Sequence, residues 1–271
     1  MTVRITCLTR NFQVMKLIKI LFIWIVLLYC FIPNSIQAKT FDFSDWGVLL
    51  DKYVRPSKID GVLFNAVDYG ELRLDGSFSK LVNNLTLYSP ANLKSHDEKL
   101  AFWINVYNVF AVKIVVDNYP VQSIKDIGGL FKSVWKLEAG IVGGKGYSLN
   151  EIEHQILRKM REPRIHAAIV CASISCPDLS KDVFDSKNIN KQLDSTVKSF
   201  LANPGKGMKI DAHGKRIFLS LIFDWFEEDF KISGGVLKFI EPYIPPNYQQ
   251  IFKSRSASIS YMRYNWSLNG I

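Results

Sequence analysis

The sequence predicts an α+β fold: a single domain with a buried central helix and a small mixed or antiparallel sheet. Helical and strand patterns follow one another without the regular β-α-β alternation of a parallel sheet. One segment, residues 100–116, is apolar on every side, which is typical of a helix buried in a core. No internal repeat or low-complexity linker divides the chain, so we expect one domain over residues 39–271.

The first 38 residues have the pattern of a secretory signal peptide, with Met15 as an alternative start of translation. Lys16 and Lys19 precede an unbroken apolar run over residues 20–32, and Ala38 closes a cleavage site. A run of 13 residues is too short to span a membrane comfortably. We therefore expect an exported protein, periplasmic or extracellular, with no stable membrane anchor.

The charge pattern gives no indication of nucleic-acid binding. Removal of residues 1–38 takes away four basic residues and no acidic one, which lowers the formal net charge from +9 to +5. No dense basic stretch interleaved with aromatic residues remains, so we expect no nucleic-acid partner. A mildly basic exported protein suits the anionic cell envelope or cell wall, and the identity of any partner stays unknown.

Three helices are predicted in the first half of the domain. Ser95 and Glu98 form a capping box in front of the apolar segment, which Pro120 ends. The two earlier helices carry apolar residues at helical spacing, at Trp46, Leu49, Leu50 and Tyr53 and at Phe78, Leu81, Val82 and Leu85.

Two amides, Asn105 and Asn108, lie one turn apart on the central helix. Buried amides need hydrogen-bond partners, so this pair either braces a loop or orients a catalytic imidazole.

The second half of the domain mixes short elements. The Gly-rich residues 126–146 lack the spacing of a phosphate-binding loop and predict turns around a hairpin. The other predicted elements are a helix over 189–201, hairpin strands over 208–210 and 217–219 joined around His213-Gly214, helices over 221–230 and 236–243, and a final strand in SYMRYNWSLNG.

The candidate site lies in residues 147–177, which begin with a predicted helix over 149–160 capped by Ser148 and Glu151. A helical wheel places Glu153 in the apolar stripe, His154 at its margin and Arg158 on the opposite side. A buried carboxylate needs a cation or strong donors, or it stays protonated with a raised pKa. Glu153 is therefore either a structural ion pair or a functional group.

A buried strand over residues 165–171 is predicted to follow, ending at Cys171. Alternation along this strand puts His166 and Cys171 on opposite faces, so His154 is the simpler partner for the thiol. His166 alone is more often a core histidine than a ligand. A turn rich in hydroxyls follows and ends at Cys176, a second candidate nucleophile.

The chain resembles the Domain of Unknown Function 547 family in pieces that follow one another along the predicted domain. They are AFWINVYN, SIKDIGG, YSLNEIEHQILR, RIHAAIVCASISCPDL, QLD, FLSLIFDWFEEDF and YNWSLNG. The resemblance implies one α+β domain and no settled activity. It marks as motif positions Asn105, Asn108, Glu153, His154, Arg158, His166, Cys171 and Cys176.

Three functions fit these residues. In the first, Cys171 is the nucleophile of an exported hydrolase or acyltransferase, with His154 or His166 as base and Asn108 or Glu153 as orienting group. In the second, the protein is a non-catalytic envelope module with a Cys171–Cys176 disulfide, because these are the two cysteines left after signal cleavage in an oxidising compartment.

The third function is a zinc site, with no other cofactor expected. His154, His166, Cys171 and Cys176 have side chains that zinc prefers, although their spacing matches no familiar zinc finger.

Overall fold

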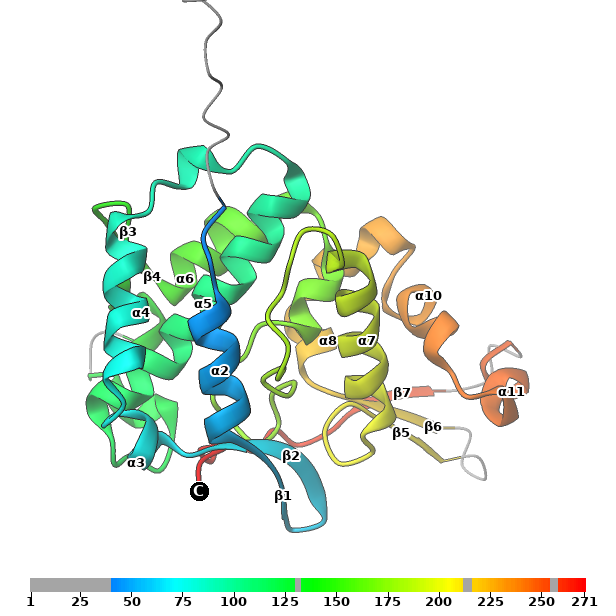
Figure 1. Ribbon diagram of the computed structural model, residues 1–271. Coiled ribbons are helices and arrows are strands. Elements are labelled where there is room, and N and C mark those ends of the chain that lie inside the picture. The colour runs from blue at the N-terminus through cyan, green and yellow to red at the C-terminus, as the bar shows by residue number, and fades with distance from the viewer. Residues whose placement is uncertain (1–39, 130–132, 212–215, 254–257) are drawn as a thin grey trace, which may run out of the picture. The chain divides into compact units, whose positions relative to one another are not determined.

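The computed structural model describes residues 40–129, 133–211, 216–253 and 258–271 (Figure 1). The predicted signal segment and the predicted turn at His213-Gly214 lie outside these ranges. Within them, helices and small sheets form the predicted α+β fold, and residues Thr40–Ile271 make one compact unit.

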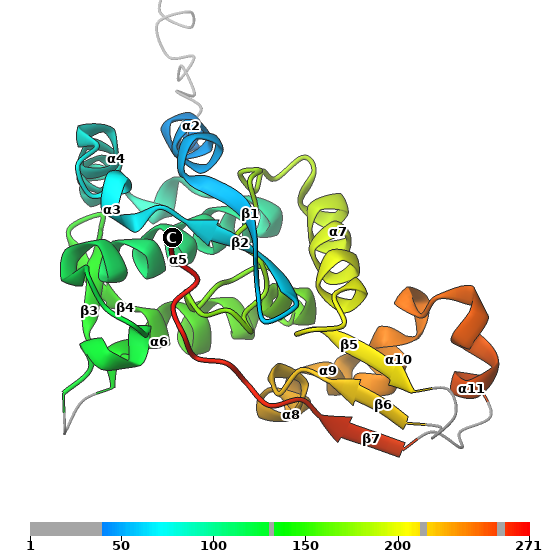
Figure 2. The ribbon, with the colours of Figure 1, turned by 90° about the horizontal axis from the view of Figure 1, so that it is seen from below.

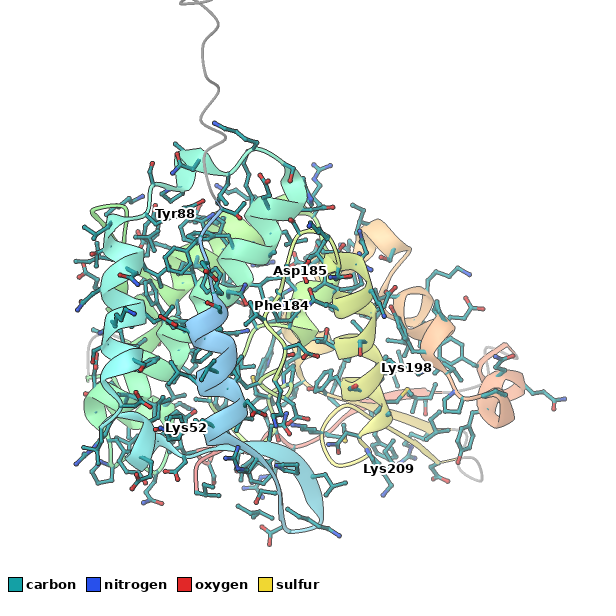
Figure 3. All side chains as sticks on the ribbon, viewed as in Figure 1. Lys52, Tyr88, Phe184, Asp185, Lys198 and Lys209 are labelled. Carbon is teal, nitrogen blue, oxygen red and sulfur yellow. The ribbon has the colours of Figure 1, made fainter. Side chains whose placement is uncertain are left out.

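The two predicted helices at the start of the domain are α2 (Ser44–Tyr53) and α4 (Gly76–Leu87), with the short α3 (Tyr69–Leu72) between them. Their predicted apolar residues are buried, apart from the half-buried Val82. Asp75 caps α4 through the backbone of Ser77 and pairs with Lys52, which Figure 3 labels, at 3.0 Å.

The central helix is α5 (His96–Asn118), and the predicted capping box of Ser95 and Glu98 is formed. In the described part of the chain, α5 is the helix long and apolar enough to cross a membrane, and 83% of its most apolar window is buried in the fold. That burial is typical of a core helix, as the sequence predicts. Side chains from α2, α4 and α6 join it in the largest of three apolar clusters in the described residues.

Three small sheets accompany the helices. β1 (Val54–Ile59) and β2 (Val62–Val67) form an antiparallel hairpin, and β3 (Glu138–Val142) and β4 (Lys145–Ser148) form another. In the third sheet, β6 (Arg216–Leu219) pairs antiparallel with β5 (Met208–Asp211) and parallel with β7 (Ser258–Tyr261). The β1–β2 hairpin is not among the predicted elements, although Asp60-Gly61 is a typical hairpin turn.

The remaining helices are α7 (Ile189–Ala202), α8 (Ile222–Trp225), α9 (Glu227–Phe230), α10 (Val236–Ile240) and α11 (Gln249–Lys253). The helix predicted over residues 221–230 is interrupted at Phe226, which leaves α8 and α9 as separate short helices. α7, α8, α10 and the third sheet enclose the second apolar cluster. Cys171 packs against both clusters, so it lies where the two parts of the core meet.

The strand predicted over residues 165–171 is wrong. Pro163–Ala167 form a 3-10 helix, η6, which begins at Pro163, and the Glu162 side chain accepts a hydrogen bond from the Arg164 amide at its start. The amide of Asn108 then bonds both the Ala168 carbonyl and the Val170 amide, which are backbone groups that a sheet would need. Because these residues do not form a strand, His166 and Cys171 are not held on opposite faces of a sheet.

The predicted helix over residues 149–160 is continuous but changes its winding. It starts as α6 (Leu149–Glu151), with the predicted capping box, continues as a π-helix, η4 (Ile152–Leu157), and ends as the 3-10 turn η5 (Arg158–Met160). In the π-helix the Arg158 amide bonds the Glu153 carbonyl five residues earlier. The wheel of an α-helix therefore misplaces Arg158, which lies near Glu153 rather than on the opposite side.

The C-terminal segment leaves β7 and crosses back to the first half of the domain (Figure 2). Only part of the predicted last strand pairs in a sheet, as β7. Beyond it, isolated bridges join Leu268 to Ser173 and Gly270 to Val67. This return brings Tyr264 and Trp266 beside the turn that follows Cys171.

Candidate active site

The turn that carries Cys171 is held by hydrogen bonds from two directions. On one side the Asn108 amide fixes the backbone just before Cys171, at 2.9 Å to the Ala168 carbonyl and 3.0 Å to the Val170 amide. On the other side, Asn269 donates its backbone amide to the Ala172 carbonyl at 3.0 Å. The position of the thiol is therefore set by α5 and by the C-terminal segment together.

The backbone directly after Cys171 is strained. Ala172 has a φ of 56° and is fully buried. A left-handed conformation costs a residue with a Cβ roughly 1 kcal/mol or more, and such residues cluster at functional sites. The hydrogen bonds around the turn hold Ala172 in this conformation and direct the Cys171 side chain.

Three polar groups surround the Cys171 thiol. Its Sγ lies 3.1 Å from Oγ of Ser173 and 3.2 Å from the hydroxyl of Tyr264. The Cys171 amide donates to Sγ of Cys176 at 2.8 Å, so the second thiol lies in the same small space. Hydroxyl and thiol hydrogens can rotate, so all three groups can donate to an ionised sulfur on Cys171.

The pKa values of the two cysteine thiols are shifted in opposite directions. The Cys176 thiol, followed by Ser173 and Tyr264, lowers the pKa of Cys171 to about 7 even though burial opposes ionisation. Burial raises the pKa of Cys176 well above its ordinary value, and an ionised Cys171 raises it further. Of the two cysteines, Cys171 is therefore the one that carries a thiolate near neutral pH.

A second group of polar side chains is organised by Asp229 on α9. Nε2 of His166 lies 2.8 Å from Oδ2 of Asp229, and Arg158 forms a two-pronged pair with the same carboxylate at 2.6 and 2.8 Å. Both partners hold the pKa of Asp229 well below its usual range, although burial opposes them. Asp229 is thus a carboxylate that holds one ring nitrogen of His166.

The two histidines have different hydrogen-bonding roles. The Asp229 carboxylate can only accept, so Nε2 of His166 carries a proton, and Nδ1 is left as the nitrogen that exchanges protons. For His154, the Arg158 guanidinium donates to Nδ1 at 2.7 Å, which leaves Nε2–H as a donor. Burial and Arg158 lower the pKa of His154, so this ring stays neutral. His166 suits general acid–base work, and His154 suits hydrogen-bond donation.

Glu153 is buried, as predicted, with 7% of its surface exposed. Its hydrogen-bond partner is the Tyr107 hydroxyl, which donates to Oε2 at 3.1 Å. One neutral donor does not compensate for burial, so burial raises the pKa of Glu153 to about 7 despite Tyr107 and Arg158. Of the alternatives open from the sequence, the raised pKa is the one this geometry supports.

Glu153 is therefore expected to make stability fall as the pH rises. Its pKa of about 7 lies above the ordinary 4.5, so between these values the folded chain keeps a proton that the unfolded chain has released. A shift of this size corresponds to about 3 kcal/mol. Urea melts at pH 5 and pH 8 should show Glu153→Gln gaining about that much relative to wild type at the higher pH. The exposed Glu71→Gln is the control, and a Glu153→Gln difference that is the same at both pH values would contradict the burial argument.

One cavity, of about 290 Å³, is lined by both cysteines and both of these histidines. Its polar lining comes from η4, η6 and the turn after Val170, and includes Glu153, His154, His166, Cys171 and Cys176. Its apolar lining includes Trp135, Ile222, Trp225, Phe226, Tyr264 and Trp266. Cys171 is partly exposed within the fold, and so it is accessible to a ligand that fills this space.

Five of the seven predicted site residues therefore line one cavity, and the two asparagines do not. Asn108 supports the cavity from beneath by holding the backbone before Cys171. Asn105 holds the backbone of Phe184, labelled in Figure 3, with bonds of 2.8 and 3.1 Å. Within the described residues the thiol of Cys171 hydrogen-bonds to hydroxyls and to no histidine.

Sequence reasoning missed Asp229 and Tyr264. Asp229 follows Phe226 by three residues and precedes the buried Phe230, which places it on the inward side of the predicted helix over 221–230. A carboxylate at such a position was a usable signal. Tyr264 had none, because its approach to Cys171 depends on the return of the C-terminal segment across the fold.

The ligand set for zinc is not assembled. Among the described residues, no group of three or more His, Cys, Asp or Glu side chains lies close enough together to hold a metal ion.

Part of the chain matches a known family. Residues 90–201 match the family model described as "Protein of unknown function, DUF547". Over this segment the chain is similar to the DUF547 family. The predicted resemblance is thus confirmed over a DUF547 segment that contains Asn105, Asn108, Glu153, His166 and Cys171. Neither a curated protein nor a solved structure matches the chain.

Asp229 and Tyr264 lie beyond the DUF547 match. The cavity is therefore built from the DUF547 segment together with the C-terminal third of the chain.

Proposed function

We propose that the protein is an exported cysteine-dependent hydrolase or acyltransferase with Cys171 as its nucleophile. The observation that carries this proposal is the setting of the thiol. Cys171 is held on a strained turn, accepts up to three hydrogen bonds, and opens into a cavity that is also lined by His166, whose Nε2 is held by Asp229. A lowered thiol pKa, a histidine and an orienting carboxylate are the groups that acyl transfer through cysteine requires.

In the first step, the Cys171 thiolate attacks the carbonyl carbon of an ester, thioester or amide. The proton released by the Cys171 thiol passes to Nδ1 of His166. A C–S bond then forms, the bond to the leaving group breaks, and the leaving group takes that proton from Nδ1. The donors around Sγ stabilise the thiolate before attack, so ionisation does not require direct contact with an imidazole. His154 Nε2–H is a donor suited to the developing oxyanion.

In the second step, water or another acceptor attacks the Cys171 thioester. His166 Nδ1 removes the acceptor's proton, the C–S bond breaks, and the acyl group leaves as a carboxylic acid or a new ester or amide. Asp229 stabilises the imidazolium formed at His166 through the bond to Nε2. Because His166 alternates between acid and base, one histidine serves both steps.

The alternative function, a non-catalytic envelope module, requires a Cys171–Cys176 disulfide in the native protein. Both cysteines are free thiols in the structure. The two cysteines are nevertheless close, because the Cys171 amide donates a hydrogen bond to Sγ of Cys176. This closeness is the observation that favours the module as a second candidate function.

Alkylation of Cys171 distinguishes the two. In native protein, the rate of iodoacetamide labelling, located by peptide mass spectrometry, should rise with a midpoint near pH 7, below the value of about 8.5 for an ordinary thiol. Cys176→Ser should move the midpoint upward, because Cys176 makes the largest contribution to the lowered pKa.

Two results would reject the nucleophile proposal. Native exported protein without a labelled thiol unless reductant is added would favour the disulfide module. A labelling midpoint at or above that of a free thiol, in protein whose thiols are reduced, would remove the chemical basis for Cys171 as nucleophile.

A further inference from the structure

The lining of the cavity is largely aromatic beside Cys171 and the histidines. Five of its aromatic residues are here called the aromatic wall: Trp135, Trp225, Phe226, Tyr264 and Trp266. The proposed reaction uses only the Tyr264 hydroxyl of this wall, so the rings are left to contact a ligand.

Four rings of the wall contact one another. Trp225 and Trp266 stack with centroids 5.6 Å apart and planes 19° apart. Tyr264 lies 4.8 Å from Trp225 and 4.5 Å from Trp266, and Trp135 meets Trp266 edge-on at 5.7 Å. The fifth ring, Phe226, stacks on the His166 ring at 4.1 Å.

The exposure of Trp225 points to binding rather than to packing. Trp225 is 44% exposed, although indole rings are usually well buried. Tyr264 links wall and nucleophile directly, because its hydroxyl reaches Sγ of Cys171 while its ring belongs to the wall. The carbonyl carbon of an acyl group that rests on the wall is therefore held close to Sγ of Cys171.

The volume of the cavity limits the size of the ligand. A cavity of about 290 Å³ is at the small end of the range for ligand sites, so it suits one compact group rather than a peptide or a long chain.

We propose that the aromatic wall is the acyl-binding subsite, and that the preferred substrates carry an aromatic acyl group, such as an arylacetyl ester or thioester. This inference rests on the proposed function of Cys171. Offset stacking and edge-to-face contacts between rings stabilise an aromatic group beyond the burial of its area.

The test compares thioesters that share one non-aromatic leaving group, N-acetylcysteamine, and carry phenylacetyl, cyclohexylacetyl or acetyl groups. Acylation of Cys171 in the intact protein is followed by mass spectrometry. Phenylacetyl should react about 10-fold or more faster than acetyl, and several-fold faster than cyclohexylacetyl, which has a similar shape without a π-system.

Substitutions at Trp225 test whether the aromatic wall causes the preference for phenylacetyl. Trp225→Ala should remove most of the preference for phenylacetyl over acetyl, measured as the ratio of the two acylation rates in the same variant, whereas Trp225→Phe should keep most of it. Leu237→Ala, which removes an exposed apolar side chain from α10, is the control and should change neither rate.

The outcomes separate this inference from the proposed function. Acylation of Cys171 at equal rates by all three thioesters would overturn the aromatic subsite and leave the nucleophile intact. If no thioester acylates Cys171, the proposed function fails, and the wall is tested by binding alone. Phenylacetamide should then quench tryptophan fluorescence in Cys171→Ala but not in Cys171→Ala with Trp225→Ala, and absence of quenching in both would overturn the subsite.

Discussion

Replacing Cys171 with Ala is expected to lower turnover of phenylacetyl and acetyl thioesters by roughly 10³-fold or more, because removal of a nucleophile eliminates the covalent route. Steady-state hydrolysis, with folding checked by circular dichroism, measures this. The side chain packs at the meeting point of two apolar clusters, and Ala keeps the backbone bonds around it.

Cys176→Ala is the matched variant. It removes the largest contribution to the lowered pKa of Cys171 but not the attacking atom, so its loss of turnover should be much smaller. A Cys171→Ala protein that keeps its turnover while Cys176→Ala loses it would assign the nucleophile to Cys176.

Asp229→Asn is expected to reduce turnover by about 10² to 10⁴-fold, because an amide neither fixes the His166 tautomer nor stabilises its imidazolium. The pH profile should change as well, because burial lowers the pKa of His166 and the Asp229 carboxylate opposes that lowering. Asp229 acts through His166 and is a positioning residue, so the change in the profile separates this role from a general loss of stability.

Asp224→Asn is the control for this prediction. Asp224 lies on the adjacent α8, is exposed, and undergoes the same chemical change. Equal turnover and equal pH profiles for the Asp229→Asn and Asp224→Asn proteins would show that His166 needs no carboxylate, and the proposed acid–base pair would be wrong.

Much of the fold follows from local patterns in the sequence. The capping boxes at Ser95 and Ser148 mark helix starts, and the uniformly apolar stretch on α5 marks the core. The residues 165–171 are the main failure, because their apolar composition suits a strand while the backbone hydrogen bonds go to Asn108 and other side chains. Such competition from distant side chains is not visible in a local pattern.

The candidate site was predictable only in part. Glu153, the two histidines and the two cysteines lie close together along the chain, and the structure collects them around one cavity. The partners that set their chemistry come from far away, since Asp229 lies 63 residues beyond His166 and Tyr264 lies 93 beyond Cys171. The π-helical turn also changes which residues face each other, so an ideal wheel separates Arg158 from Glu153.

The most direct measurement of the central claim is the mass of the intact protein after brief reaction with the phenylacetyl thioester and quenching in acid. The wild-type protein should gain the mass of one phenylacetyl group, located on the peptide that contains Cys171, and Cys171→Ala should gain none. Hydrolysis that proceeds with no acyl group on Cys171, or an equal adduct on the Cys171→Ala protein, would contradict nucleophilic catalysis by this cysteine.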